Sequence, residues 1–356
     1  MRTIIISAID TLSEALQCIR LSLIGLSQRV RMLKLCRSQG VTLSKQQREA
    51  VRRYWRTYTR RNRSYFQSHY SFVHGKFDVR YIPNDLWVTV IDPYLNDRKF
   101  GVFGNKFYQR LLFDCPQPDT IFMRSPRGVY YNDRYETIPK ERAVGLFMRH
   151  GRAVFKPLAS AGGRGITFLE SDKEEEIAEF LDSLENTSGY VAQEVVEQHP
   201  LLSSIHGDSL NTLRIMTFLL DNKAVVLSVV LRMGINGNKV DNASSGGIVC
   251  GVKENGQLKE VAYSITGKRY DQHPQGFAFC DCVVPSYKKA LSMVTSLAER
   301  VPDLRLIAWD VAINESGEPV LIEANVRRGD VGVMQYANGP LFAEYTDRVL
   351  SEIFCQ

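Results

Sequence analysis

The sequence predicts an α+β fold that follows a basic helical N-terminal region. Three observations lead to this prediction. Residues 1–66 repeat apolar side chains at helical spacing, the second half contains short apolar runs separated by turn signals, and two helical segments interrupt those runs. Runs joined by short turns pair antiparallel, which favours α+β over a doubly wound sheet. At 356 residues the chain can form two or three structural units.

The first 27 residues are apolar but carry charges at Asp10, Glu14 and Arg20. They leave no run of the roughly 20 apolar residues that a membrane span needs, and they lack the features of a signal peptide. The apolar residues recur every three or four positions, which predicts an amphipathic helix. We expect it to pack on the protein, with contact to a membrane surface as the alternative. The repeating residues are Ile5, Ile9, Leu12, Leu16, Ile19, Leu23 and Leu26.

Positive charge is concentrated in residues 28–63. This segment holds 12 Lys or Arg and one acid, Glu49, so its net charge is +11 while the rest of the chain carries about −5. Such a segment can face anionic lipid, an acidic polymer or nucleic acid, or it can be a solvated helix face. Tyr54, Trp55 and Tyr58 would suit single-stranded nucleic acid, but they equally suit the buried side of a basic helix. We favour the helix and expect no nucleic-acid partner.

Cysteine and histidine spacing gives no sign of a zinc site. The seven cysteines are scattered apart from one C-x-C at Cys280 and Cys282, and the six histidines form no ligand motif. We therefore expect reduced thiols in a cytoplasmic protein.

Four segments are expected along the chain. Residues 1–70 form the basic helical region and residues 71–105 a mixed lead-in segment. Residues 106–195 form a first subdomain and residues 196–356 a second. Strands are expected at 153–156, 166–169, 190–196, 213–220, 224–233, 247–252, 306–313 and 319–323, and helices at 173–184 and 287–300.

The strongest chemical signal lies on the last two expected strands. Asp310 is on one strand, and Glu323 and Asn325 end the next. Residues two apart in a strand point to the same side, so a hairpin can bring all three together. Carboxylate and amide oxygens are the ligands that Mg²⁺ prefers, and carboxylates within apolar runs are costly unless paired or coordinated. We predict a metal site here, with a hairpin that simply exposes polar residues as the alternative.

A glycine-rich hairpin tip gives a second signal. Lys156 ends one expected strand, and Gly162, Gly163 and Gly165 follow it. A lysine can reach phosphate oxygens, and glycine backbone N–H groups can close around them. The pattern is neither a Walker A loop nor a dinucleotide-binding fingerprint. Downstream, residues 193–197 suit a hinge that offers backbone groups to adenine and an acid to ribose.

Two arginines occupy even positions among apolar neighbours. Arg214 and Arg232 can therefore point the same way, toward a carboxylate or a phosphate, or they can form structural ion pairs. The polar loop 241–247 suits either a ligand or a plain hairpin connection. Arg327 and Arg328 could hold an acidic substrate or lie free on the surface.

Taken in order, these pieces resemble the ATP-grasp superfamily, and within it the sugar-transfer-associated ATP-grasp group. The resemblance runs from about residue 70 to 345. One departure is Asn105-Lys106, where the resemblance implies Asp-Lys. The matching pieces are Phe77-Asp78-Val79-Arg80-Tyr81-Ile82-Pro83, Asn105-Lys106, Phe155-Lys156-Pro157, Asn211-Thr212-Leu213-Arg214, Asp241-Asn242-Ala243-Ser244-Ser245-Gly246-Gly247, Trp309-Asp310 and Glu323-Ala324-Asn325.

The resemblance implies an ATP-grasp fold, in which two α+β subdomains grip ATP. It implies Lys106 and Lys156 on phosphates beneath a mobile glycine lid, and Arg232 near the γ-phosphate. It implies that Arg214 contacts substrate or the transferred phosphate. The remaining implied contacts are the backbone of Val195–Glu197 with adenine and two Mg²⁺ ions on Asp310, Glu323 and Asn325. From the residues themselves we also expect Glu194, Val195, Val196 and Glu197 at the nucleotide, and substrate at Asn242, Ser245, Gly246, Arg327 and Arg328.

The expected activity is an ATP-dependent carboxylate–amine ligase that forms an amide through an acyl phosphate. An amino acid and a sugar of a surface polysaccharide, free or lipid-linked, are the substrates that the resemblance suggests. The basic residues 28–63 would then hold the enzyme at an anionic membrane, on the inner face. The alternatives are a phosphotransferase on the same fold and a nucleotide-binding protein that has lost catalysis.

Overall fold

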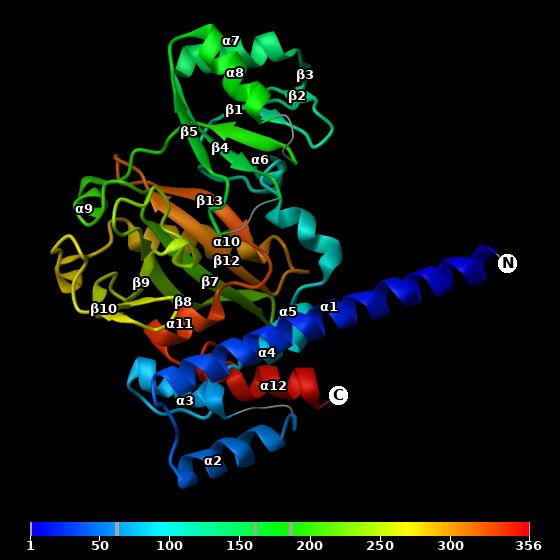
Figure 1. The fold of residues 1–356 in the computed structure, drawn as a ribbon, viewed down its shortest axis with the longest axis vertical. Coiled ribbons are helices and arrows are strands. Elements are labelled where there is room, and N and C mark those ends of the chain that lie inside the picture. The colour runs from blue at the N-terminus through cyan, green and yellow to red at the C-terminus, as the bar shows by residue number, and fades with distance from the viewer. Residues whose placement is uncertain (1, 61–63, 160–161, 185–187, 356) are drawn as a thin grey trace.

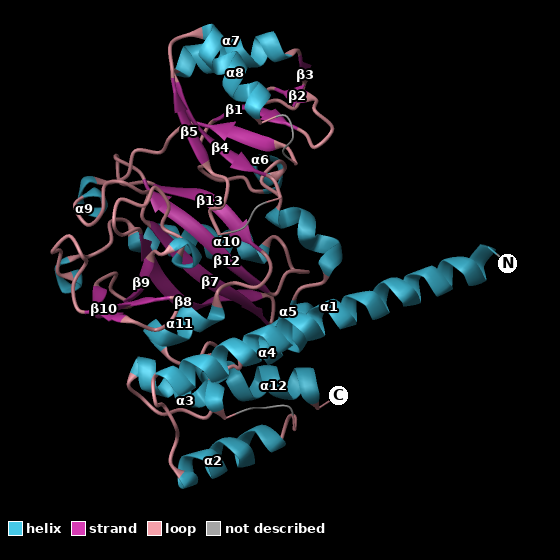
Figure 2. Cartoon of the chain, viewed as in Figure 1, coloured by secondary structure: helices cyan, strands magenta, loops and turns pink. Residues whose placement is uncertain are grey.

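The computed structural model describes residues 2–60, 64–159, 162–184 and 188–355, arranged as two β-sheets and a layer of N-terminal helices. Figure 1 shows the smaller sheet at the top, the larger sheet in the middle and the N-terminal helices at the bottom. The chain therefore passes from the helices to the small sheet and returns to the large one. The same layers are visible by element type in Figure 2.

Among the described residues up to Leu95, the regular elements are helices and helical turns joined by short loops. The long α1 lies beside α3 and the short helices after it, and α2 begins at a capping box in which Ser44 and Gln47 bond each other's backbone N–H. The elements are α1 (Arg2–Ser38), α2 (Lys45–Arg56), α3 (Tyr65–His74), α4 (Asn84–Leu86), the π-helical η1 (Trp87–Ile91) and α5 (Asp92–Leu95).

The aromatic residues of α2 pack on the chain itself. Trp55 is buried and its Nε1 donates to the Val79 carbonyl oxygen at 2.7 Å. The hydroxyls of Tyr54 and Tyr58 donate to the Asp347 carboxylate at 2.6 and 3.0 Å. Trp55 therefore lies on the buried side of a basic helix, as predicted, while Tyr54 and Tyr58 are half-buried beside it.

The small sheet has the strand order β3-β2-β1-β6-β4-β5. The hairpin predicted around the glycine-rich tip is present as β4 and β5, with Phe155 paired to Thr167. Two helices cover one face and share its apolar core. The elements are β1 (Thr120–Arg124), β2 (Tyr130–Tyr131), β3 (Thr137–Ile138), α7 (Lys140–His150), β4 (Arg152–Pro157), β5 (Thr167–Glu170), α8 (Glu174–Ser183) and β6 (Tyr190–Gln193).

The large sheet has the order β11-β10-β9-β8-β7-β12-β13, with antiparallel neighbours throughout. The predicted turn between β7 and β8 is tight, because Asp221 and Asn222 both adopt positive φ. The strands are β7 (Thr212–Leu220), β8 (Lys223–Met233), β9 (Ile248–Val252), β10 (Leu258–Ser264), β11 (Arg269–Tyr270), β12 (Leu306–Ile313) and β13 (Pro319–Asn325).

The two faces of the large sheet are buried by different helices. Odd-numbered residues of β12, such as Trp309, pack with α10 (Tyr287–Glu299), whereas Ala308 packs with α11 (Val331–Asn338) and the N-terminal helices. Asp310 therefore lies on the second face. The other elements are η2 (Arg98–Gly104), α6 (Gln109–Leu112), α9 (Pro200–Ser203), η3 (Ala243–Ser245), η4 (Phe279–Asp281), η5 (Ala343–Tyr345) and α12 (Thr346–Phe354).

Two expectations about the chain need correction. The strand expected at 190–196 ends at Gln193, because the chain leaves the small sheet there to cross to the large one. The lead-in segment 71–105 contains short helical turns and, among its described residues, no regular strand. The division into four segments stays a prediction, although its boundary at residue 70 falls inside α3.

No helix among the described residues is long and apolar enough to cross a membrane. All seven cysteines are free thiols.

Candidate active site

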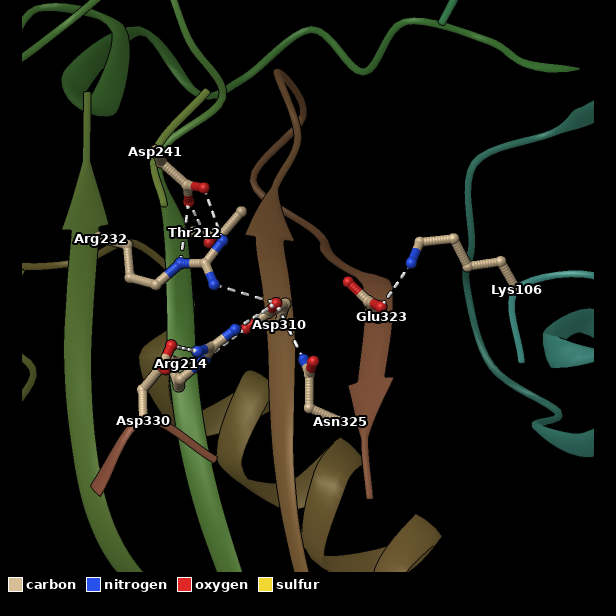
Figure 3. Close-up of polar contacts among 9 residues, drawn as sticks. All are labelled: Lys106, Thr212, Arg214, Arg232, Asp241, Asp310, Glu323, Asn325 and Asp330. Atoms are coloured by element: carbon tan, nitrogen blue, oxygen red, sulfur yellow. Dashed lines mark hydrogen bonds and ion pairs between the residues drawn. The ribbon is translucent and has the colours of Figure 1, made fainter. Parts of the chain in front are cut away.

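The site is organised around Asp310, a buried carboxylate on β12. Register pairs it with Arg214 of β7 on one side and with Glu323 of β13 on the other. Arg214 donates to both oxygens of Asp310, from Nε at 2.9 Å and from Nη2 at 2.8 Å. Asn325 Nδ2 donates to Oδ2 at 3.1 Å. Figure 3 shows these side chains converging from neighbouring strands, as their spacing predicted.

Arg232 of β8 connects this carboxylate to a second one. Its Nη1 donates to Asp310 Oδ2 at 3.2 Å, and its Nη2 donates to Asp241 Oδ1 at 2.5 Å. The Thr212 hydroxyl also donates to Asp241 (Figure 3). Both arginines thus point the same way, and in this structure both are engaged in ion pairs.

Burial and charge act in opposite directions in this cluster. Burial would raise the pKa of Asp310, but Arg214 and Arg232 outweigh it and hold the pKa below its usual value. For Arg214, burial is outweighed by Asp310 and Asp330, which raise the pKa of the guanidinium. Asp310 is therefore ionised throughout the physiological range.

The predicted metal ligands lie side by side, and their chemistry fits Mg²⁺. Asp310 and Glu323 are directly opposed on β12 and β13, and the Asn325 side-chain oxygen makes no hydrogen bond within the described part of the chain. Glu323 Oε1 accepts from Lys106 Nζ at 2.6 Å. Among described residues, no three His, Cys, Asp or Glu side chains gather as a metal site. Any metal would therefore depend on two carboxylates and an amide.

A cavity of about 310 Å³ opens beside this cluster, between the two sheets. Its lining includes Lys156, whose ammonium has no hydrogen bond or ion pair among the described residues. Burial lowers the pKa of Lys156 to about 8, with Glu323 opposing the shift. A half-buried cation without a partner is costly unless an anion approaches it. Predicted site residues on the lining are Lys106, Lys156, Gly162, Gly163, Glu194, Val195, Val196, Glu197, Arg232, Asn242, Asp310 and Glu323.

The crossing segment after β6 provides free backbone groups on the same cavity. Glu194 is tied to the backbone of Asp119, and the Glu197 carbonyl accepts from Glu315 N at 2.8 Å. Between them, the backbone groups of Val195 and Val196 make no hydrogen bond within the described chain. These half-buried groups are therefore open to a ligand in the cavity, and a planar ligand with donors and acceptors, such as adenine, would fit them.

The glycine lid, described here over residues 162–165, is closed against the large sheet. The Ser245 hydroxyl donates to the Gly162 carbonyl at 2.8 Å. Gly163 has φ +75°, and a Cβ there would meet Asn242 Oδ1 at 2.5 Å. The lid and the predicted substrate loop are thus in direct contact. Gly165 and Gly246 lie outside the cavity lining.

A second cavity, of about 220 Å³, lies among α1, η1, α11 and the segment that follows β13. Asp330, which pairs with Arg214, lines it together with Arg328, and α1 contributes Arg31. Neither Arg31 nor Arg328 has an ion-pair partner among the described residues. Arg327 lies outside both linings, and its Nε is buried without a partner. Of the two predicted substrate arginines, only Arg328 therefore reaches a cavity.

Three residues of the site escaped sequence reasoning. Asp241 was seen only as part of a polar loop, although its position opposite the arginine strands could have marked it as their partner. Asp330 follows a strand without any motif. Arg31 lies in a segment whose charge suggested only surface contacts, and no local pattern relates it to a cavity.

The sequence matches the family described as sugar-transfer associated ATP-grasp over residues 91–349. The chain belongs to this family. Membership confirms the ATP-grasp fold predicted from the sequence. No curated protein matches the sequence.

Solved ATP-grasp structures resemble the chain only distantly. The ligase PsnB with minimal precursor, Mg and ADP is 13% identical, over 73% of this chain and 62% of that one, with a TM-score of 0.43. D-alanyl-alanine synthetase A from Vibrio cholerae is 12% identical over 76% and 68%, with a TM-score of 0.40. D-cycloserine synthetase DcsG is 12% identical over 69% and 70%, with a TM-score of 0.42. The chain spans less than two thirds of PsnB.

Proposed function

We propose that the protein is an ATP-dependent carboxylate–amine ligase that forms an amide and releases ADP and phosphate. The observation that carries this proposal is the Asp310 cluster beside the unpartnered ammonium of Lys156. Anionic and cationic groups held close together suit the binding of a charged polyphosphate together with its metal. Family membership supports the same nucleotide.

In this proposal the chain positions ATP through contacts on both sheets. Backbone groups of Val195 and Val196 bind adenine, and Glu197 binds ribose. Lys156 and Arg232 bind phosphate oxygens, with Lys106 beside them. Asp310, Glu323 and Asn325 would hold one or two Mg²⁺ ions, which offset phosphate charge when bound.

The reaction would proceed in two displacements. A substrate carboxylate oxygen attacks the γ-phosphorus, and the bond to the ADP oxygen breaks. The amine nitrogen then attacks the acyl carbon, the bond to phosphate breaks and the nitrogen loses a proton. Arg214 and Arg232 stabilise the charge that builds up, and the chain supplies no covalent nucleophile.

The second cavity is the place we assign to an acidic group of the substrate other than the carboxylate that reacts. Arg328 and Arg31 carry free guanidinium groups there, and guanidinium binds carboxylate well. Asp330 joins the cavity to Arg214 and hence to the reacting centre. Asn242, Ser245 and Gly246 form the loop beside it. A uronic acid or an amino acid fits this chemistry, and the family's description favours a sugar for one of the partners.

The direct test is nucleotide turnover with hydroxylamine present. Purified protein, Mg-ATP and pools of carboxylic acids are assayed for ADP and hydroxamate, with Asp310→Asn as control. We expect ADP and hydroxamate, both lost in the variant. Formation of AMP would contradict the acyl phosphate.

A phosphotransferase is the second candidate, because every ATP contact above would serve it equally. It would produce ADP and a stable phosphorylated product, with no hydroxamate.

Residues 28–63 are proposed to hold the enzyme at the cytoplasmic, anionic face of a membrane. Arg52 and Arg53 of α2 are exposed and point away from the packed side. Flotation with vesicles containing phosphatidylserine should weaken in Arg52→Glu/Arg53→Glu. Equal flotation of the natural chain and of this double variant would contradict the proposal.

A further inference from the structure

Only part of helix α1 packs against the rest of the protein, which we call the body. It spans 37 residues. Leu21, Met32 and Cys36 are buried against the protein, where α1 contacts α3, α4 and η1. Toward its N-terminus the helix leaves the body and projects away from it (Figures 1 and 2). The projecting part needs another partner, because most helical stability in proteins comes from packing.

The side of α1 that faces away from the body carries a continuous apolar stripe. Six large apolar residues there are each 37–62% exposed. We call them the α1 stripe. A contiguous exposed patch of this kind usually marks an interaction surface. Its members are Leu16, Ile19, Leu23, Leu26, Val30 and Leu33.

The spacing of the α1 stripe alternates strictly between three and four residues. In the sequence the same alternation continues upstream at Ile5, Ile9 and Leu12, which gives four heptads in all. A repeat of 3.5 residues is the pattern of a coiled-coil seam. On a straight helix such a seam drifts by about 20° per heptad. A flat membrane would therefore meet only part of the stripe, whereas a second supercoiled helix meets all of it.

The residues around the stripe also favour a helix over lipid. Ala15, Ser22 and Ser27 flank it and are small enough for another helix to approach. Residues 2–28 contain two arginines, one aspartate and one glutamate, so this part of α1, with four of the six stripe residues, is neutral and has no attraction for anionic lipid. The basic residues Arg29, Arg31, Lys34 and Arg37 lie beyond it, next to Val30 and Leu33.

We propose that the chain forms a two-fold symmetric dimer through the α1 stripe of two copies. The stripe is self-complementary, as an interface on a two-fold axis must be. The body packs on the opposite side of α1, so it leaves the seam open. This inference goes beyond the proposed ligase activity and does not depend on it. Helix α1 does not line the nucleotide cavity, and its contribution to the second cavity includes Arg31.

The test is the mass of the full chain in solution, measured by light scattering after gel filtration. We expect twice the 40.5 kDa of one chain for the natural sequence. Leu23→Glu/Leu26→Glu should run at the mass of one chain. The matched control, Gln17→Glu/Cys18→Glu, adds the same charges outside the stripe and should stay dimeric. Binding of Mg-ATP should be equal in all three, which verifies folding.

Three outcomes would overturn the proposal. The natural chain could have the mass of one copy at micromolar concentration. Leu23→Glu/Leu26→Glu could remain dimeric, which would move the interface elsewhere. Finally, a single-copy chain could float with phosphatidylcholine vesicles and lose this in Leu23→Glu/Leu26→Glu, which would assign the stripe to a membrane.

Discussion

Asp310 accepts four hydrogen bonds from three side chains, so both of its oxygens are in use. Three of the four bonds end on Oδ2 and one on Oδ1, so Oδ1 keeps a lone pair with which it could meet a metal. If ATP binds as proposed, we expect Arg232 to turn from Asp310 toward the phosphate.

Replacing Asp310 with Asn should abolish turnover and also weaken the fold. The change leaves Arg214 and Arg232 buried without their shared counter-ion, which costs about 3–5 kcal/mol. Thermal unfolding and Mg-ATP titration measure both effects. Asp330→Asn is the control, because Asp330 also pairs with Arg214 but its side chain is 54% exposed. It should keep nucleotide affinity, and equal losses in the two variants would contradict the central role of Asp310.

Lys156 should make nucleotide affinity depend on pH. Its pKa is lowered to about 8, so its ammonium is charged below that pH and neutral above it. A phosphate binds the charged form, and Mg-ATP affinity should therefore fall as pH rises through about 8. Lys156→Arg stays charged and should give a flat profile over the same range. Calorimetry measures both, and parallel profiles would contradict the prediction.

At the scale of elements, the lid and the loop 241–247 behave as one unit. Ser245 bonds Gly162, and Gly163 lies against Asn242. The two elements come from different sheets, so we expect closure over a nucleotide to fix the position of loop 241–247 as well.

Gly163→Ala should impair this closure. The new Cβ would meet Asn242, and alanine disfavours a φ of +75°. We expect a roughly ten-fold or larger loss in Mg-ATP affinity with little change in unfolding temperature. Gly151→Ala carries the same backbone strain, at φ +72°, with no atom within 4 Å of its Cβ. If that control loses as much affinity, strain rather than contact explains the result.

Local patterns predicted the strands that carry the site, because their signals are local, but they missed β1, β2, β3, β10 and β11. The alternation of β7, β8 and β12, together with the turn at Asp221-Asn222, is enough to place Arg214, Arg232 and Asp310 on one face. The end of β6 was predicted too late because Val195 and Val196 have high strand propensity. In the structure they lie in the segment that connects the two sheets, and sequence propensity does not report where the chain leaves a sheet.

At the scale of the molecule, long-range packing could not be predicted. The second cavity joins α1 to residues some 300 positions later, and no periodicity reports such a contact. Likewise, the pairing of Lys106 with Glu323 depends on how the lead-in folds over β13. The residue types of Lys106 and Glu323 can be read from the sequence, but which side chains they contact is determined by the tertiary fold.

Arg31→Ala should weaken binding of the acidic substrate while leaving Mg-ATP affinity unchanged. Loss of one charged hydrogen bond costs about 1.5–3 kcal/mol, so KM should rise at least about ten-fold. Arg37→Ala removes the same charge from an exposed position of α1 outside the cavity and should have little effect. Initial rates with each substrate varied in turn separate the two affinities. A rise in the KM for ATP would instead indicate damage to the nucleotide site.

The position of α1 also has a consequence for substrate choice. The family match begins at residue 91, yet one wall of the second cavity comes from a helix that ends at Ser38. If the second cavity holds the substrate, as proposed, a change in this N-terminal helix would alter substrate choice and leave the strands that carry Arg214, Arg232 and Asp310 unchanged.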